Sequence, residues 1–260
     1  MIHPMIRAIT FDFWDTLAVD DSDEPKRAAL GLPSKPTARK ELFARQVAMR
    51  HPQIKPTQAM AAYDVANQRF REEWHNNHVT PGVTTRIYYA YEHLGLSPKP
   101  GHYARLVREI DELVREIEAM EVRIAPDFVP DLHYTLQLLA REYKLGIISD
   151  TIHTHGRGLR YLLDRQGVLP YFSYLVFSDE VRASKPATKV FRQAAIGLDV
   201  VPTEIVHVGD RESNDVTGPL TIGMKAVLFT GIVDRGSHHT RAHAICRQLS
   251  DLPQIVGRLD

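Results

Sequence analysis

The chain of 260 residues carries 32 Lys and Arg against 32 Asp and Glu, so its formal net charge is zero. This balance gives no overall attraction to nucleic acid or to an anionic membrane surface. The single cysteine, Cys246, excludes an intrachain disulfide, and no apolar run approaches the roughly 18 residues of a membrane-spanning helix. We therefore expect a cytoplasmic protein with no secretory signal and no nucleic-acid or membrane partner, while its oligomeric state stays open. Cys246 lies in a polar tail, where we expect it to be incidental.

The first apolar segment ends at a carboxylate. Residues 9–17 read ITFDFWDTL, a β-prone run that stops at Asp12 and is followed by Asp15 and Thr16. Such a run is typical of a buried parallel strand. Its last residues then reach the carboxyl edge of the sheet, where open α/β sheets bind ligands. An acid and a hydroxyl at this place can also form a simple turn or helix cap, so the rest of the chain must decide.

Helical periodicity dominates the next part of the chain. Apolar residues recur every three or four positions in four stretches, and no strand pattern interrupts them: residues 40–49, 58–75, 81–95 and 103–120. The preceding stretch is rich in acids, with Asp20, Asp21, Asp23 and Glu24, and should form a solvated loop or hinge. We therefore predict a separate helical cap over residues 20–125, inserted after the first strand.

From Pro126 onward, strand patterns alternate with helix patterns. The strand candidates are residues 145–150, 174–178, 205–210 and 225–229, and the helix candidates are residues 130–143, 158–166, 188–197 and 214–222. Strands that alternate with helices indicate βαβ units, which form parallel sheets. The predicted fold class is α/β: a Rossmann-like parallel sheet flanked by helices, built from residues 1–19 and 126–260, with the all-helical cap inserted.

Chemically useful side chains stand at successive strand ends. They are Asp12 and Thr16, then Ser149, then Lys185, then Asp210 with Asp215. Parallel strands share one carboxyl edge, so these side chains should meet there. A carboxylate such as Asp12 can attack phosphorus. Asp210 and Asp215 offer the hard oxygen ligands that Mg²⁺ prefers, and Lys185 would offset phosphoryl charge.

The order of these residues resembles the haloacid dehalogenase-like hydrolase superfamily. The matching motifs are Asp12-x-x-x-Thr16-Leu17, Ser149 after a strand, Lys185-Pro186 and Gly209-Asp210-x-x-x-x-Asp215. The resemblance implies a phosphatase in which Asp12 is the nucleophile, aided by Thr16, Ser149 and Lys185. It also implies substrate contacts from Ser149, Asp150 and Lys185. The implied ligands of Mg²⁺ are Asp12, the backbone carbonyl of Trp14, Asp210 and Asp215. The substrate would be a small phosphate ester or acyl phosphate.

One position departs from the phosphatase pattern. Phosphatases of this family usually carry a second Asp two residues after the nucleophile, but this chain has Trp14, which cannot transfer a proton. The dehalogenase branch carries an aromatic residue there, so a metal-free 2-haloacid dehalogenase is an alternative, with Arg39 or Arg45 as its catalytic arginine. Against it, Asp150 stands where that branch carries Asn, and the acidic Asp210 motif is that of the Mg²⁺-dependent members. A third interpretation is a catalytically weak binding or regulatory protein on the same scaffold.

Overall fold

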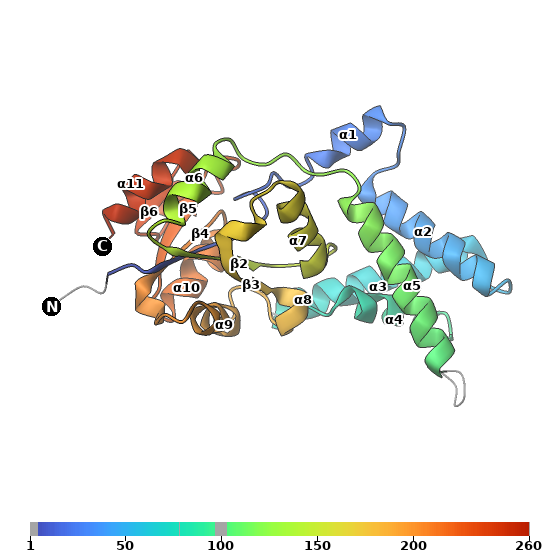
Figure 1. Ribbon diagram of the computed structural model, residues 1–260. Coiled ribbons are helices and arrows are strands. Elements are labelled where there is room, and N and C mark those ends of the chain that lie inside the picture. The colour runs from blue at the N-terminus through green and yellow to red at the C-terminus, as the bar shows by residue number, and fades with distance from the viewer. Residues whose placement is uncertain (1–4, 78, 97–102, 260) are drawn as a thin grey trace.

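A parallel sheet forms the centre of the molecule (Figure 1), seen in a computed structural model that describes residues 5–77, 79–96 and 103–259. Its strands are β1 (Ala8–Phe11), β2 (Lys144–Ser149), β3 (Phe172–Phe177), β4 (Ile205–Gly209), β5 (Lys225–Phe229) and β6 (Ala244–Cys246). The described part of the chain forms one six-stranded sheet in the order β3-β2-β1-β4-β5-β6, with every pairing parallel. The predicted α/β Rossmann-like class is thereby confirmed.

Helices cover both faces of this sheet, because the strands are apolar on both sides. One face packs against α6 (Leu132–Leu139), α7 (Gly156–Arg165) and α11 (Leu252–Gly257). The other face packs against α9 (Thr188–Leu198). Shorter segments in this part of the chain include α8 (Ser178–Val181), a π-helical turn η3 (Glu212–Thr217) and α10 (Gly218–Leu220). The sheet edge at the strands' carboxyl ends is left for the site.

The remaining helices lie between β1 and β2 in the sequence. They are α1 (Asp23–Ala29), α2 (Lys35–Arg50), α3 (Pro56–Asn77), α4 (Val83–His93) and α5 (Tyr103–Val122). Helices α2–α5, called here the helical unit, share an apolar core that includes the buried side chains of Phe43, Ile87 and Leu113. Figure 1 shows this unit to one side of the sheet. Its core is separate from the apolar clusters that flank the strands.

Two segments, residues 17–19 and 127–129, connect the helical unit to the sheet and run side by side. The backbone N–H groups of Val19 and Val129 donate to carbonyl oxygens on the opposite segment at 2.8 and 3.0 Å. We call this pair of segments the linker ribbon. The chain therefore leaves the sheet and returns to it at one place.

Several short elements differ from the sequence prediction, among them α1, β6 and α11. Residues 23–29 form α1 instead of a solvated loop, because Asp23 is buried and accepts a hydrogen bond from Lys35 Nζ at 2.8 Å. The polar tail contains β6, in which Cys246 is fully buried, and burial raises the pKa of its thiol to about 12. Cys246 is thus a core residue of an edge strand. Among the described residues, no helix has the length and apolar character needed to cross a bilayer.

Candidate active site

The register of the sheet brings the predicted residues to one edge. Because β2 and β4 both pair with β1 as far as Phe11, the positions that follow emerge together. Asp12 follows β1, Ser149 is the last residue of β2, and Asp210 follows β4. Lys185 comes from the loop after α8 and reaches the same place.

Lys185 joins two carboxylates at this edge. Its Nζ lies 2.8 Å from Asp12 Oδ1 and 2.6 Å from Asp215 Oδ1, and all three side chains are buried. The backbone N–H of Phe13 also donates to Asp12 Oδ1, at 2.7 Å. Asp12 is therefore held in one orientation by two donors, with its position fixed by the end of β1.

Burial and mutual charge set the protonation of this cluster. Burial lowers the pKa of Lys185, but the carboxylates of Asp12, Asp215 and Asp150 outweigh it, and the net pKa is raised. Burial raises the pKa of Asp215, yet Lys185 and His207 bring it below its usual value. The pKa of Asp12 is raised, because its burial outweighs the effect of Lys185. The lysine is thus charged throughout the neutral range.

His207 binds the Asp215 carboxylate, and Gly209 leaves room for that side chain; the sequence alone did not indicate the role of the histidine. His207 lies on β4, where its Nε2 is 3.2 Å from Asp215 Oδ1 and its Nδ1 is 2.9 Å from Thr10 Oγ1. Burial lowers the pKa of His207, so the ring is neutral and donates from Nε2 to the carboxylate. A Cβ on Gly209 would lie 2.3 Å from the Asp215 side chain, so only glycine fits there. A histidine in a buried strand carries no spacing that would have pointed to this contact.

Three polar atoms at the site are buried without a hydrogen-bond partner in the described structure. They are Thr16 Oγ1, Ser149 Oγ and Asp210 Oδ1. Buried polar atoms normally find partners, since an unpaired one costs about 1–3 kcal/mol. The two hydroxyl groups can therefore donate hydrogen bonds to an anionic group beside Asp12, and the carboxylate oxygen can bind a cation there.

The carboxylates of Asp12, Asp210 and Asp215 form a group that fits a divalent cation. One oxygen of each lies within 4.8 Å of the others, and all three side chains are buried. Burial, Asp12 and Asp215 raise the pKa of Asp210 to about 6, which a cation would reverse. Both oxygens of Asp215 already accept hydrogen bonds, the second from the Arg211 backbone N–H at 3.0 Å. Asp12 and the free Asp210 Oδ1 are therefore the better direct ligands.

Arg235 is a site residue that the sequence did not indicate. Its Nε donates to Asp210 Oδ2 at 2.6 Å, and a terminal nitrogen donates to Asp15 Oδ2 at 2.7 Å. Asp15 adopts a left-handed backbone conformation with φ of 51°, which turns its carboxylate toward this arginine. Arg235 thus binds Oδ2 of Asp210, while Oδ1 of Asp210 can still bind a cation together with Asp12 and Asp215.

Asp150 lies beside Lys185 but contacts its backbone. Asp150 Oδ1 accepts from the Lys185 N–H at 3.0 Å, and Oδ2 accepts from Asn214 Nδ2 at 3.4 Å. Burial raises the pKa of Asp150 to about 7, and Asp12 adds to the rise. Asp150 therefore fixes the loop that carries Lys185 and titrates near neutrality.

A cleft of about 550 Å³ separates the sheet edge from the helices. From the sheet side it is lined by Trp14, Asp150 and His153, and from the helical side by Lys35 and Arg39, among others. Trp14 packs edge-on against Phe13, with ring centroids 4.8 Å apart. Trp14, the residue that departs from the phosphatase pattern, therefore lines the cleft.

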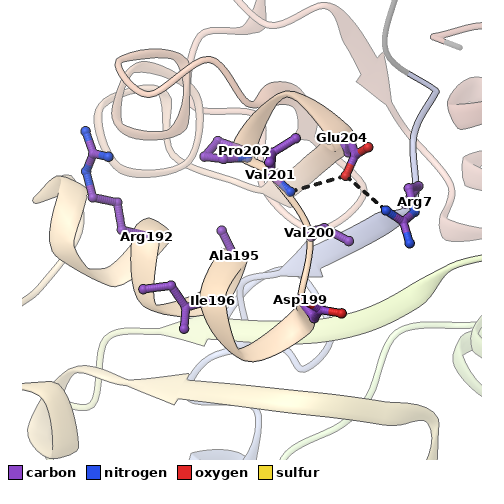
Figure 2. A pocket seen from close by; sticks show the side chains of 9 residues that line it. All are labelled: Arg7, Arg192, Ala195, Ile196, Asp199, Val200, Val201, Pro202 and Glu204. Carbon is purple, nitrogen blue, oxygen red and sulfur yellow. Dashed lines mark hydrogen bonds and ion pairs between the residues drawn. The ribbon is translucent and has the colours of Figure 1, made fainter.

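A different hollow, of about 660 Å³, lies beyond the opposite edge of the sheet (Figure 2). Its lining includes Arg7, just before β1, and Glu204, just before β4, which pair at 3.5 Å. Ile196 on α9 and Val201 add apolar surface. Because it faces the amino ends of the strands, this hollow is remote from Asp12.

Comparison with curated proteins finds phosphatases among the relatives. The chain is 32% identical over 136 residues to glyceraldehyde 3-phosphate phosphatase of Methanopyrus kandleri, a match that covers 52% of this chain and 53% of that protein. It is 36% identical over 104 residues to the protein of the same name from Pyrococcus furiosus, covering 39% and 41%. The matched region spans about half or less of these relatives.

Solved structures show the same fold over nearly the whole chain. A HAD phosphatase from Thermococcus onnurineus superposes with a TM-score of 0.60 at 25% identity, covering 97% of this chain and 98% of that one. A 2-haloacid dehalogenase from Pseudomonas syringae superposes with a TM-score of 0.63 at 19% identity, covering 98% and 100%, a likeness of fold alone. A family model described as haloacid dehalogenase-like hydrolase matches residues 6–223. With this match and the strand-end constellation around Asp12, the chain belongs to the haloacid dehalogenase-like hydrolases.

Proposed function

We propose that this chain is a Mg²⁺-dependent phosphatase that cleaves a small phosphate ester or acyl phosphate through an aspartyl phosphate on Asp12. The observation that carries the proposal is the gathering of Asp12, Lys185 and Asp210 beside the unpartnered hydroxyl groups of Thr16 and Ser149. A phosphoryl group placed among them would meet a nucleophile, a fixed cation and two hydrogen-bond donors. The phosphatase names of the Methanopyrus and Pyrococcus relatives support the same reaction class.

In the proposed reaction, a carboxylate oxygen of Asp12 attacks phosphorus, and the bond from phosphorus to the substrate oxygen breaks. Water then attacks the phosphorus of the aspartyl phosphate, the bond to Asp12 breaks, and inorganic phosphate leaves. Thr16 and Ser149 donate hydrogen bonds to the phosphoryl oxygens, and Lys185 offsets their charge in both steps. Asp215, held by His207, keeps Lys185 in position.

The donor set fits Mg²⁺, which binds oxygen ligands and offsets the charge of a transferring phosphoryl group. Asp12 and Asp210 would hold it directly, with the Trp14 carbonyl as a third protein ligand and Asp215 as a support. The unpartnered Oδ1 of Asp210 supports this assignment. Ser149, Asp150 and Lys185 would form the substrate-facing side, Asp150 by fixing the Lys185 loop. We further propose that the helical unit is the cap of this site.

Trp14 shapes the preference for leaving groups. No acid stands at the position that normally protonates the departing alcohol, and Asp15 is held by Arg235. A leaving group that needs little protonation, such as the carboxylate of an acyl phosphate, should therefore be favoured.

The test is release of inorganic phosphate from a panel of phosphate esters and acyl phosphates, with and without EDTA. Phosphate release that EDTA abolishes, and that Asp12→Asn abolishes, is the expected result. An Asp12→Asn variant with unchanged turnover would overturn the assignment of the nucleophile.

A dehalogenase is the second candidate, and Trp14 at the wall of the cleft is the observation that favours it. In that reaction Asp12 attacks carbon and displaces halide without a metal. The same panel extended to 2-haloacids separates the two functions: halide release that EDTA leaves untouched would replace the phosphatase. Retained ligand binding without release of either product would instead indicate the binding or regulatory protein.

A further inference from the structure

A basic hollow in the helical unit adjoins the catalytic cleft. It measures about 710 Å³ and shares Pro36, Arg39, Ile152 and His153 with the lining of the cleft. The cleft reaches the candidate active site at Trp14, two residues after Asp12, and at Asp150, which binds the Lys185 backbone. A small substrate whose phosphoryl group lies at Asp12 can therefore extend through the cleft toward the hollow. The residues that line the hollow would then contact the end of the substrate that lies away from the cleaved phosphoryl group.

Positive charge dominates the lining of this hollow. It carries Arg39, Lys40, Arg71 and Arg86, against one carboxylate, that of Asp64, which pairs with Lys40. Arg39 has its own partner, Glu121 of α5, at 2.7 Å. Among the described residues, no carboxylate pairs with Arg86 or with Arg71, so these two arginines carry the unbalanced positive charge of the hollow.

Arg86 is unusual among the residues that line the hollow, because it is a buried cation with no ion-pair partner among the described residues. Its side chain is 1% exposed, yet it forms no ion pair with a carboxylate of any described residue. Its terminal nitrogens donate to neutral acceptors: His153 Nδ1 at 2.5 Å, the Ile152 carbonyl at 2.6 Å and Asn67 Oδ1 at 3.3 Å. Its guanidinium lies 3.7 Å from the centre of the Phe70 ring, and its Nε has no hydrogen-bond partner in the described structure. Burial lowers the pKa of Arg86 to about 10. A buried cation without a counterion is unfavourable, so an anion bound beside Arg86 would be stabilised.

His153 places a hydrogen-bond donor at the same point. Arg86 can only donate, so His153 Nδ1 accepts and the ring proton lies on Nε2. Burial and the charges of Arg86, Arg39, Lys35 and Arg71 hold the pKa of His153 well below its usual value, so the ring is neutral. Because His153 lines both the cleft and the hollow, it stands where the two meet.

We propose that this hollow is a subsite for a second anionic group of the substrate, recognised by Arg86, Arg71 and His153. The substrate class is then a small phosphorylated molecule that bears a carboxylate or a second phosphate away from the phosphoryl group that is cleaved. The inference rests on the proposed phosphatase function and deepens it. A distal anion supplies the counterion that Arg86 lacks.

The test uses substrates matched except at the far end. 3-Phosphoglycerate and glycerol 3-phosphate differ by a carboxylate in place of a hydroxymethyl group. The bisphosphate of 1,3-propanediol and its monophosphate supply the arm with a second phosphate. For each pair the ratio of kcat/KM is measured, because the fraction of unfolded enzyme cancels in that ratio. The chain is compared with Arg86→Met, Arg86→Lys, Arg71→Met and, as a matched control, Arg69→Met, whose arginine stacks on Tyr89 outside the hollow.

In at least one pair, we expect kcat/KM to be at least tenfold higher for the substrate that carries the second anionic group. The pair that shows this difference identifies whether the distal group is a carboxylate or a phosphate. Arg86→Met should reduce the ratio toward one, Arg86→Lys should keep part of it, Arg71→Met should lower it, and Arg69→Met should keep it. A ratio near one in the unmodified chain, or an unchanged ratio in Arg86→Met, would overturn the subsite.

Binding separates this inference from the proposed function. Calorimetric titration of Asp12→Asn with the same pairs measures affinity without turnover. Suppose that the chain hydrolyses no ester but binds the substrate with the second anionic group more tightly. That result would support the subsite and refute the phosphatase function. Equal binding in a chain that does hydrolyse esters would remove the subsite alone.

Discussion

In the proposed phosphatase reaction, Trp14 leaves the departing group without a proton donor, and restoring one should change the preferred substrates. We expect Trp14→Asp to raise turnover of an alkyl phosphate by roughly 100-fold or more, the usual worth of a positioned acid. Turnover of an acyl phosphate should change little. Steady-state kinetics on both substrates measure the effect, with Trp14→Phe as the variant that keeps an aromatic wall. An alkyl phosphate rate that does not rise would mean that the missing acid is not the limitation.

Arg235 places a positive charge on a carboxylate that we assign to the metal. We expect Arg235→Met to bind Mg²⁺ roughly tenfold or more tightly, because the cation 2.6 Å from Asp210 opposes a second cation there. Arg241→Met, in the same segment, is the matched control and should leave the affinity unchanged. Calorimetric titration with MgCl₂ measures the dissociation constants. Weaker binding by Arg235→Met would show that its orientation of Asp210 matters more than its charge.

Asp150 should make stability depend on pH. Burial raises its pKa from the ordinary 3.8 to about 7, so the folded chain retains a proton that the unfolded chain has lost. Its contribution to the free energy of unfolding therefore falls as pH rises from about 4 to 7. We expect Asp150→Asn to stabilise the chain more at pH 8 than at pH 5. Urea denaturation in EDTA at both values measures this difference, and an equal effect at both would contradict it.

At the scale of single residues, a site residue could be predicted where it follows a strand or helix that the sequence marks. Asp12, Ser149, Lys185 and Asp210 each follow a recognisable element, so their convergence could be predicted from the shared edge of a parallel sheet. Arg235 could not, because its contact with Asp15 joins residues on distant loops and no pattern marks it. The polar partners of buried residues depend on tertiary packing, which the sequence alone does not display.

Helices and strands were predictable wherever their apolar period was long. The stripe on α5 and the buried runs of β2 and β5 identify these elements directly. Several short elements were missed. Among them are α1, whose Asp23 is neutralised by Lys35 from α2, and β6, whose three residues carry too little pattern. A charge can be buried when its partner arrives from another element, and composition alone cannot foresee that.

The helical unit has its own core, and a substitution there should act locally. Phe43→Ala removes a fully buried ring between α2 and its neighbours and should cost about 3–5 kcal/mol of that unit's stability. Hydrogen exchange should show weakened protection in α2–α5 and unchanged protection in the strands. Phe191→Ala on α9 is the matched change and should show the reverse. Uniform loss of protection in both variants would contradict the division into cap and sheet domain.

For the molecule as a whole, the acidic cluster should couple metal binding to stability. A cation that binds only the folded chain stabilises it by about 2.7 kcal/mol at a hundredfold excess over its dissociation constant. We therefore expect MgCl₂ to raise Tm by several degrees in a thermal melt. Asp210→Asn should lose this rise, because it removes a carboxylate that we propose as a direct ligand. The same rise in that variant would mean that Mg²⁺ acts elsewhere on the chain.

The paired connections between sheet and helical unit limit how these two parts of the molecule could move relative to each other. Because residues 17–19 and 127–129 are bonded to each other, the two crossings cannot bend independently. Any displacement of the helical unit from the sheet would therefore have to turn at this one connection. It would also have to break the hydrogen bonds from Arg86 to His153 and to the Ile152 carbonyl, and the contact between Glu118 of α5 and Arg157 of α7.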